Sequence, residues 1–414
     1  MTVELLLILL LAVLLSWVIL LWKWRHTIYG CWHEPVLRRQ VLIIESDDWG
    51  PGPDWHAERL ASLRQRMARY VDADGRPALM TLGIVLSVPD TAKLATNGLA
   101  EYQRLTLKHD RCSRLLQQMK AGMLEHVFAL QLHGMEHFWP GALLEEARHN
   151  NSVREWLTSE QFPKQALLPS SLQSRWIDGS YQPSQPLSKR DIQRAVAEEI
   201  GAWEHVFGST PKVAVPPTFV WTQEVEAAWI SKGIEVVVTP GRRFTHRDTN
   251  GQPAADAPGR IYNGQKVGES AQYLVRDIYY EPERGHTEEQ ALNAANERFL
   301  LGRPALLETH QSNFIGSDSE FEQHLGSLER LLSIALERWP ALAFISPKQL
   351  ADVYLERKNS WVATGLQTRL HFMLRRLGAE SRLRKLAYLT GIAAPAALAL
   401  MLTAPAMKRS GEVD

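Results

Sequence analysis

Eight short runs rich in Val, Ile and Leu recur along the central part of the sequence, separated by longer amphipathic stretches. The runs lie near residues 41–46, 78–87, 127–132, 212–215, 234–239, 273–279, 305–309 and 342–345. Buried strands that alternate with helices favour a parallel sheet with covered faces, most simply a (β/α) barrel. The sequence therefore predicts an α/β fold over residues 39–356.

Two adjacent acids follow the first run directly. Asp47 and Asp48 come at its end and precede a turn rich in Gly and Pro at 49–52. Strand ends at the rim of an α/β barrel carry the chemistry of such enzymes, so both carboxylates are predicted to lie at a rim. Two ionised acids side by side require a cation or a shared proton. The alternative is that one acid caps a helix that begins near Asp54.

Two histidines follow the third run. His133 and His137 are four residues apart, a spacing that places them on one side of a helical turn, and Gly134 allows a tight bend. Zn²⁺ favours imidazole nitrogens with a carboxylate oxygen and leaves one position open for water. Asp48 and the two histidines would supply that set. A surface or packing role for the histidines is the alternative.

A further apolar run, 304–309, also ends on an ionisable residue, His310. Taken alone, His310 is explained as an ordinary strand-end histidine. Three strands that each end on an acid or an imidazole indicate a shared rim, because the carboxyl ends of parallel strands meet at one edge.

In this order, the motifs resemble those of the polysaccharide deacetylases with a NodB-homology domain, a carbohydrate esterase 4-like family. That family has a distorted (β/α) barrel and removes N- or O-acetyl groups from glycans with a divalent metal. The resemblance implies that Asp47 is the general base and that His310 protonates the leaving group. It implies that Asp48, His133 and His137 bind the metal, most simply Zn²⁺. A glycan or a lipid-linked sugar would be the substrate.

One motif of that family is matched only in part, by residues 213–219. Val215 stands where the family has an arginine that orients the catalytic acid, so this arginine is missing or is replaced from elsewhere, for example by Arg276. Pro217 and the backbone N–H near Thr218 are the implied oxyanion or substrate contacts, with a plain strand-ending turn as the alternative. The missing arginine leaves a second function open, a catalytically inactive barrel that serves as a glycan-binding or scaffold protein in a membrane complex.

Two further features border the predicted rim. Asn313 follows His310 closely and is predicted to contact a sugar, with loop capping as the alternative. Segment 150–188 breaks the rhythm of strands and helices. An insertion there would overhang the metal ligands and influence substrate choice, or form a surface excursion.

Both ends of the chain indicate a membrane. Residues 5–22 form an uncharged apolar run, which predicts a transmembrane anchor over 1–25. A cleavable signal peptide is disfavoured, because no basic region precedes the run and no small-residue cleavage site follows it. Segment 362–414 combines a basic amphipathic stretch with an apolar stretch at 386–407, which can span or lie on the surface, and predicts membrane association.

Two arguments disagree about the side of the membrane on which the catalytic domain lies. Basic residues follow the first apolar run and none precedes it, so the positive-inside rule places the catalytic domain in the cytoplasm at the inner (plasma) membrane. Family relatives that act on exported glycans argue for the opposite side. A lipid-linked sugar or nascent precursor on the cytoplasmic face would reconcile the two.

The charge balance restricts the remaining partners. The chain has Lys+Arg 46 against Asp+Glu 46, so it lacks the basic excess that nucleic-acid binding favours. Its two cysteines, Cys31 and Cys112, match neither a disulfide framework nor a zinc ribbon. The expected partners are a glycan and a lipid bilayer, and no nucleic acid.

Overall fold

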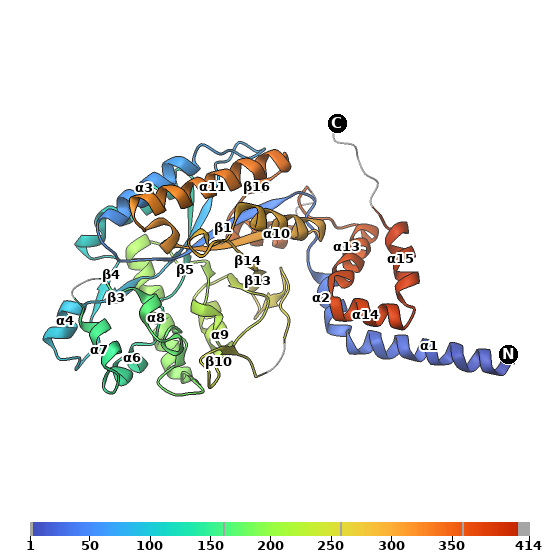
Figure 1. Cartoon of the computed structure of the whole chain (residues 1–414), viewed down its shortest axis with the longest axis horizontal. Coiled ribbons are helices and arrows are strands. Elements are labelled where there is room, and N and C mark those ends of the chain that lie inside the picture. The colour runs from blue at the N-terminus through green and yellow to red at the C-terminus, as the bar shows by residue number, and fades with distance from the viewer. Residues whose placement is uncertain (1–2, 160–161, 257–258, 358–359, 405–414) are drawn as a thin grey trace.

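The chain forms an α/β body with a group of terminal helices at its side (Figure 1). The computed structural model describes residues 3–159, 162–256, 259–357 and 360–404. The central sheet has the strand order β12-β13-β9-β8-β5-β2-β1-β15-β14, with β16 paired to β1. This curled, mostly parallel sheet is a half-barrel, which confirms the predicted α/β class and agrees with a (β/α) barrel type.

The strands of this sheet lie close to the predicted runs. They are β1 (Val41–Trp49), β2 (Met80–Ile84), β5 (Phe128–Leu132), β8 (Val213–Ala214), β9 (Val236–Thr239), β12 (Lys266–Val267), β13 (Ala271–Val275), β14 (Ile278–Tyr279), β15 (Ala305–His310) and β16 (Ala343–Phe344). Neighbours pair in parallel, except that β12 is antiparallel to β13. The run predicted at 273–279 is divided between β13, which is second from one end of the sheet, and β14, which is at the other end.

Three two-stranded sheets lie outside the half-barrel. They pair β3 (Ser87–Pro89) with β4 (Arg104–Thr106), β6 (Ile177–Asp178) with β7 (Gln185–Pro186), and β10 (His246–Arg247) with β11 (Pro253–Ala254). All three are antiparallel, so the described strands outside the half-barrel are local hairpin-like additions.

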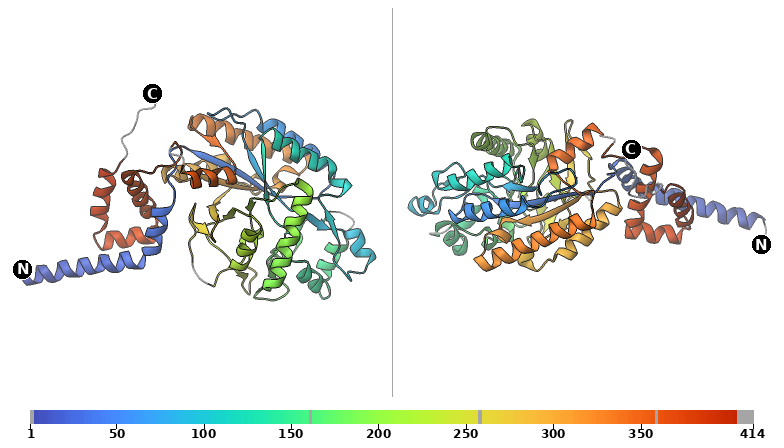
Figure 2. Two further views of the ribbon diagram at one scale, coloured as in Figure 1. Left: turned by 180° about the vertical axis from the view of Figure 1, so that it is seen from behind. Right: turned by 90° about the horizontal axis from the view of Figure 1, so that it is seen from above.

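Amphipathic helices cover the outside of the sheet (Figures 1 and 2). They include α3 (Trp55–Met67), α5 (Ser113–Leu124), α8 (Lys189–Phe207), α9 (Gln223–Ser231), α10 (Glu288–Leu300), α11 (Asp318–Arg338) and α12 (Pro347–Glu356). In α8, the buried Ile192, Ala195 and Val196 follow helical spacing and face the sheet. The strand β1 in the middle of this sheet is buried along its length except at Asp48, which is partly exposed.

The segment predicted as an insertion, 150–188, packs against the body. It contains α7 (Asn151–Thr158), two 3₁₀ turns, and the pair β6 and β7. With α4 (Thr91–Thr96) and α6 (Pro140–Ala147) it encloses a second, smaller core. Arg175 and Trp176 from this segment are among the most deeply buried side chains, so this part of the segment belongs to the folded body.

The two ends of the chain pack against each other. The N-terminal pair is α1 (Val3–Lys23) and α2 (Arg25–His33), and the C-terminal group is α13 (Leu366–Ala379), α14 (Ser381–Leu389) and α15 (Ala393–Leu402). The indole of Trp17 donates to the carbonyl of Thr390 at 2.7 Å. Arg376 of α13 is buried and donates to the carbonyls of Glu34 and Gly302 at 2.7 and 3.2 Å. The helix group is thereby attached to the edge of the half-barrel.

The helix α1 projects from the body and is long and apolar enough to cross a membrane (Figure 2). Membrane anchors and signal sequences share this property, so the structure supports either interpretation of the N-terminal run. In the apolar stretch predicted at 386–407, α14 and α15 are bent by 112° relative to each other. The described part of that stretch is therefore not one straight helix, and residues 405–414 lie outside the described residues.

Candidate functional site

The acid pair lies at an irregularity in β1. The register between β1 and β2 shifts between Ser46 and Trp49, so Asp47 and Asp48 occupy a bulge at the strand end. Asp48 has a φ of 71°, a left-handed conformation that is rare for residues other than glycine. Bulges of this kind redirect side chains beside active sites. The alternative capping role is excluded, because α3 has Asp54 as its N-terminal cap residue.

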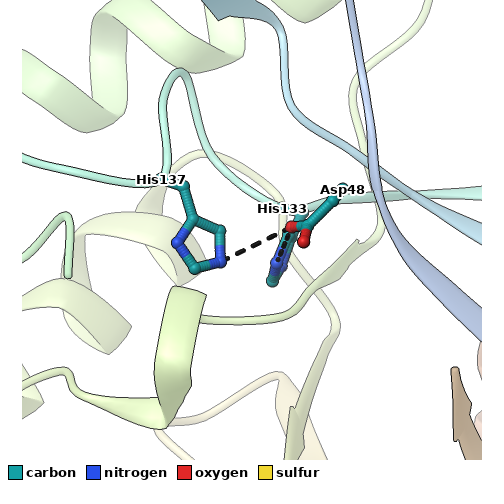
Figure 3. Close-up of side chains that lie close together, drawn as sticks. All are labelled: Asp48, His133 and His137. Atoms are coloured by element: carbon teal, nitrogen blue, oxygen red, sulfur yellow. Dashed lines mark ion pairs between the residues drawn. The ribbon is translucent and has the colours of Figure 1, made fainter. Parts of the chain in front are cut away.

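Asp48, His133 and His137 form one cluster (Figure 3). Each offers one ligand atom, and these atoms all lie within 4.8 Å of one another. The Asp48 Oδ1 atom is 3.3 Å from His133 Nε2 and 3.5 Å from His137 Nε2. The histidines lie in an irregular loop after β5 rather than on the predicted helical turn, and Gly134 bends this loop with a φ of +107°.

The hydrogen bonds of both imidazoles direct their other nitrogens toward Asp48. His133 Nδ1 donates to the carbonyl of Val215 and His137 Nδ1 to that of Gln173, both at 3.0 Å. Since a carbonyl only accepts, each Nδ1 carries a proton and each Nε2 of a neutral ring presents a lone pair. Carbonyl contacts of this kind commonly fix the orientation of metal-binding histidines.

The charges in the cluster fit a cation. Asp48 Oδ1 is buried and has no hydrogen-bond partner within the part of the chain that the structure describes. Burial raises the pKa of Asp48, but its histidine neighbours, among them the charged His310, outweigh burial, so the net pKa lies below its usual value. Burial lowers the pKa of His137 to about 4, which leaves this imidazole neutral. An anionic oxygen facing imidazole lone pairs is the donor set that Zn²⁺ prefers.

Asp47 lies beside Arg276. Its Oδ2 atom accepts a hydrogen bond of 2.6 Å from Nη2 of Arg276, and both side chains are buried. Burial opposes ionisation of Asp47, but the guanidinium charge outweighs it and lowers the pKa of Asp47 to about 2. A Cβ at Gly83 of β2 would lie 2.3 Å from Asp47 Oδ1, so glycine provides the space for this carboxylate.

Arg276 also contacts two acids that the sequence analysis did not identify. Its Nη1 is 3.2 Å from Glu45 Oε2 and its Nε is 3.1 Å from Glu308 Oε2. Burial raises the pKa of Glu45 to about 7, so the Glu45 carboxyl beside Arg276 is protonated below that pH. Glu45 and Glu308 each stand inside an otherwise apolar strand, where a charged residue is rare unless it has a partner. Their position in these strands was therefore a sequence signal that they belong to a buried charge network.

His310 is the lateral neighbour of Asp47, because β15 pairs with β1 in the register Asp47↔His310. Its Nδ1 lies 2.5 Å from Oε1 of the buried Glu281, another residue that the sequence analysis missed. Burial lowers the pKa of His310, but the hydrogen bond to Glu281 and the attraction of Asp48 raise it to about 10. His310 is therefore a proton donor at neutral pH.

Asn313 does not face the open side of the site. Its side chain is fully buried, and its amide donates to Glu281 Oε2 at 2.5 Å and to Thr309 Oγ1 at 3.1 Å. In this geometry Asn313 holds Glu281 in place beneath His310, which departs from the predicted contact with a sugar.

Residues of the partly matched motif border the cluster. Pro217 packs beside Gly134, and Thr218 has a φ of 54° and shares a hydrogen bond of 2.6 Å with Ser174. The main contribution of this segment to the cluster is the Val215 carbonyl that orients His133. The side chain of Val215 is buried and apolar, and the guanidinium beside Asp47 comes from β13–β14 instead.

Glu136 lies between the two histidines and forms part of the supporting structure. It is buried and forms an ion pair of 2.6 Å with Arg175, which also contacts Glu199 at 3.1 Å. Gln173, whose carbonyl orients His137, precedes Arg175 by two residues. The segment 150–188 therefore helps to position a candidate ligand.

Comparison with known proteins gives one family match. Residues 171–281, about a quarter of the chain, match the model of glycosyl hydrolase family 57. No curated protein sequence matches the chain. The matched segment includes Thr218, Arg276 and Glu281, and lies downstream of the three candidate metal ligands.

Solved structures of carbohydrate enzymes are similar at low levels. A 4-alpha-glucanotransferase from Thermococcus litoralis has a TM-score of 0.42 and 10% sequence identity. The match covers 77% of this chain but only 40% of the glucanotransferase. A family 4 carbohydrate esterase from Streptomyces lividans has a TM-score of 0.34 and 12% identity, with 75% and 94% of the two chains covered. A peptidoglycan deacetylase from Bacillus subtilis has a TM-score of 0.36 and 10% identity, with 78% and 94% covered. Similarities this low assign no activity.

The family match corrects the prediction from sequence. The predicted membership of the polysaccharide deacetylase family was wrong, because the matching family model is that of glycosyl hydrolase family 57. The predicted removal of acetyl groups is wrong for the same reason, and the oxyanion role of Pro217 and Thr218 belonged to that reaction. The match supports a carbohydrate-active hydrolase or transferase, and a glycan substrate is consistent with it.

Proposed function

We propose that this protein is a glycan-processing hydrolase or transferase that acts on a glycosidic bond at the rim formed by β1, β5 and β15. The observation that carries the proposal is the convergence of an ionised acid, a protonated histidine and a cation-ligand set at this rim. The match to a glycosyl hydrolase family supports the type of bond. Cleavage of a glycosidic bond requires a proton donor for the departing oxygen and a base for the incoming nucleophile.

His310 and Asp47 meet these two requirements. His310 carries a proton at neutral pH and would donate it from Nε2 to the departing glycosidic oxygen, since its Nδ1 is hydrogen-bonded to Glu281. Asp47, kept ionised by Arg276, would accept the proton of the incoming hydroxyl group. If that hydroxyl belongs to water the reaction is hydrolysis, and if it belongs to a sugar the reaction is transfer.

Asp48, His133 and His137 would hold a divalent cation, for which Zn²⁺ is our first choice. When bound, such an ion supplies a Lewis acid that polarises a coordinated oxygen and lowers the pKa of coordinated water. The left-handed backbone at Asp48 and the two carbonyl contacts of the histidines fix the positions of the three donors. This fixed geometry supports the proposed cation site.

The alternative of an inactive glycan-binding barrel was motivated by the missing arginine at Val215. Arg276 supplies the guanidinium contact to Asp47 from the link between β13 and β14, so that motivation no longer applies. We place the enzyme at a membrane with α1 as its anchor, where a glycan or a lipid-linked sugar is the substrate. The cytoplasmic orientation stays a prediction from the basic residues that follow α1.

The proposal is tested with the purified full chain in a neutral detergent. The chain is loaded with zinc and incubated with a panel of α- and β-linked oligosaccharides, and chromatography with mass spectrometry detects both new reducing ends and altered chain lengths. We expect cleavage or transfer that falls by about 10²-fold or more in Asp47→Asn and His310→Ala. The exposed Asp54→Asn is the matched control and should retain activity. Absence of cleaved or transferred products from every linkage, or undiminished activity in Asp47→Asn, would refute the proposal.

A further inference from the structure

A cavity apart from the candidate site lies between the half-barrel and the terminal helices. Its volume is about 910 Å³, and it is separate from the candidate cation ligands. It is lined by Trp24 and Glu34, which flank α2, by Val275 at the end of β13, by Asp277 just after it, and by Arg382 of α14. We call this cavity the arginine pocket, because six arginines line it: Arg242, Arg243, Arg260, Arg298, Arg303 and Arg382.

Four of these arginines have acidic partners. The pairs are Arg243–Glu226 at 2.7 Å, Arg298–Asp277 at 3.0 Å, Arg303–Glu34 at 2.8 Å, and Arg260–Glu380. Only two of these acids, Glu34 and Asp277, line the pocket themselves. The charges of these four guanidinium groups are therefore balanced, two of them by acids in the pocket wall and two by acids outside it.

Arg242 and Arg382 lack such partners. Both side chains are exposed, and no ion pair is found for either within the described residues. The guanidinium of Arg242 lies 5.8 Å from the ring centroid of Phe244, which also lines the pocket. The pocket therefore carries unbalanced positive charge from two separate elements, the loop after β9 and the helix α14.

The chemistry of these groups favours phosphate. A guanidinium presents several N–H donors in a planar fork that matches the oxygens of phosphate, and several such groups around one cavity match an anion with many acceptor oxygens. A single carboxylate would leave most of the donors unused. A phosphate monoester or a diphosphate would engage arginines from both sides.

The position of the pocket agrees with a ligand at a membrane surface. Trp24 directly follows α1, the helix that is apolar enough to cross a bilayer. The same end of α1 carries Trp22 stacked under Arg25 at 4.7 Å, an arrangement suited to the headgroup layer. Basic pockets beside membrane-spanning helices bind the phosphates of lipid headgroups.

The pocket also shares a chain segment with the candidate site. Val275 and Asp277 line the pocket, whereas Arg276 between them is buried and contacts Asp47. Successive side chains of an extended segment point to opposite sides. A ligand in the pocket would therefore contact the two neighbours of the arginine that keeps Asp47 ionised.

We propose that the arginine pocket binds a phosphate monoester or diphosphate group, carried either by a membrane lipid or by a soluble phosphorylated compound. This proposal does not depend on the bond that the candidate site cleaves. It predicts phosphate binding that requires Arg242 and Arg382.

Isothermal titration calorimetry of the full chain in neutral detergent tests the proposal with two probes. The probes are inorganic diphosphate and a short-chain phosphatidic acid, with a short-chain phosphatidylcholine, a zwitterionic phosphodiester without net charge, as the control. The variants are Arg242→Gln and Arg382→Gln, and Arg384→Gln is the matched control, because Arg384 lies on the same helix and does not line the pocket. An Asp48→Asn chain separates binding in the pocket from binding to a metal.

We expect one or both phosphate probes to bind, with affinity reduced about tenfold or more in Arg242→Gln and Arg382→Gln and unchanged in Arg384→Gln and Asp48→Asn. Preference for diphosphate, or equal affinity for both probes, indicates a soluble source of the phosphate. Preference for phosphatidic acid indicates a lipid source, and each of these results supports the pocket. The proposal is overturned if neither probe binds, if Arg384→Gln weakens binding as much as Arg382→Gln, or if only Asp48→Asn abolishes it.

Discussion

Arg276 and Asp47 are 229 residues apart in the sequence and share a hydrogen bond of 2.6 Å in the buried interior of the half-barrel. The guanidinium also contacts Glu45 and Glu308, so one cation balances three carboxyl groups. This arrangement explains how an acid with almost no solvent exposure stays ionised beside a candidate cation site.

Removal of Arg276 should destabilise the fold and abolish activity together. Arg276→Met leaves three buried acids without their cation, and breaking a buried ion pair costs about 3 to 5 kcal/mol. Denaturant unfolding of the detergent-solubilised chain measures this loss. Arg330→Met is the control, since Arg330 forms an exposed pair with Glu288 and should change stability by less than about 1 kcal/mol. Equal stability of the two variants would contradict the proposed role.

Glu281 should set the alkaline limit of activity. His310 must be protonated to act as an acid, and Glu281 helps to hold its pKa at about 10. Activity should therefore be retained below that pH and lost as the pH rises through it. In Glu281→Gln the pKa of His310 falls, so the loss should begin at a lower pH. The pH–rate profile of glycan cleavage measures the shift, and Glu283→Gln, whose carboxylate bonds to Ser312 instead, should leave the profile in place.

Gly83 should be required for the position of Asp47. In Gly83→Ala the new Cβ would lie 2.3 Å from Asp47 Oδ1, so the carboxylate must move away from its present place. We expect a loss of activity of about tenfold or more and a destabilisation of about 1 to 3 kcal/mol. Gly201→Ala in α8 is the control, because its Cβ meets no atom within 4 Å, and it should stabilise the helix by about 0.5 to 1 kcal/mol. Full activity in Gly83→Ala would show that this space is not needed.

His56 should make the fold sensitive to mild acid. Burial lowers its pKa to about 4, below its usual value of 6.5, so the unfolded chain binds the proton more tightly. Stability should be complete above pH 6.5 and fall as the pH decreases to 4, by about 3 kcal/mol if this residue acts alone. Unfolding measured at a series of pH values tests this. His56→Gln should flatten the curve over that interval, and an unchanged slope would mean that other groups cause it.

The sequence carried enough information to predict most strands of the half-barrel and the donor cluster. Asp48 lies at the end of one short apolar run, and His133 and His137 follow another. The parallel pairing of β1, β2 and β5 brings the ends of these two runs together. The pairing of β1 with β15 places His310 beside Asp47 in the same way. Local sequence patterns predict these contacts, because the carboxyl ends of parallel strands lie at one edge of the sheet.

The supporting residues were harder to predict because their partners are distant. Arg276 was named as a replacement for the missing arginine, but only the position of β13–β14 shows that it reaches Asp47. Glu281 lies in a loop with no recognisable pattern, and its role depends on Asn313 from the loop after β15. Contacts of this kind follow from the path of the whole sheet and have no local sequence signature.

The family prediction failed because its motifs were short. An acid pair and two spaced histidines are short patterns, and such patterns recur on unrelated proteins. The matching family model covers residues 171–281, where the predicted family was represented by the incomplete motif at Val215. The departure at Val215 was therefore more informative than the matches around it.

Metal content of the purified full chain tests the central claim most directly. Inductively coupled plasma mass spectrometry after incubation with a mixture of divalent ions and gel filtration should find about one ion per chain. Asp48→Asn and His133→Ala should lose that ion, whereas the exposed Asp54→Asn should keep it. A chain that retains no divalent ion, or an ion that remains after the loss of Asp48 and His133, would contradict the account.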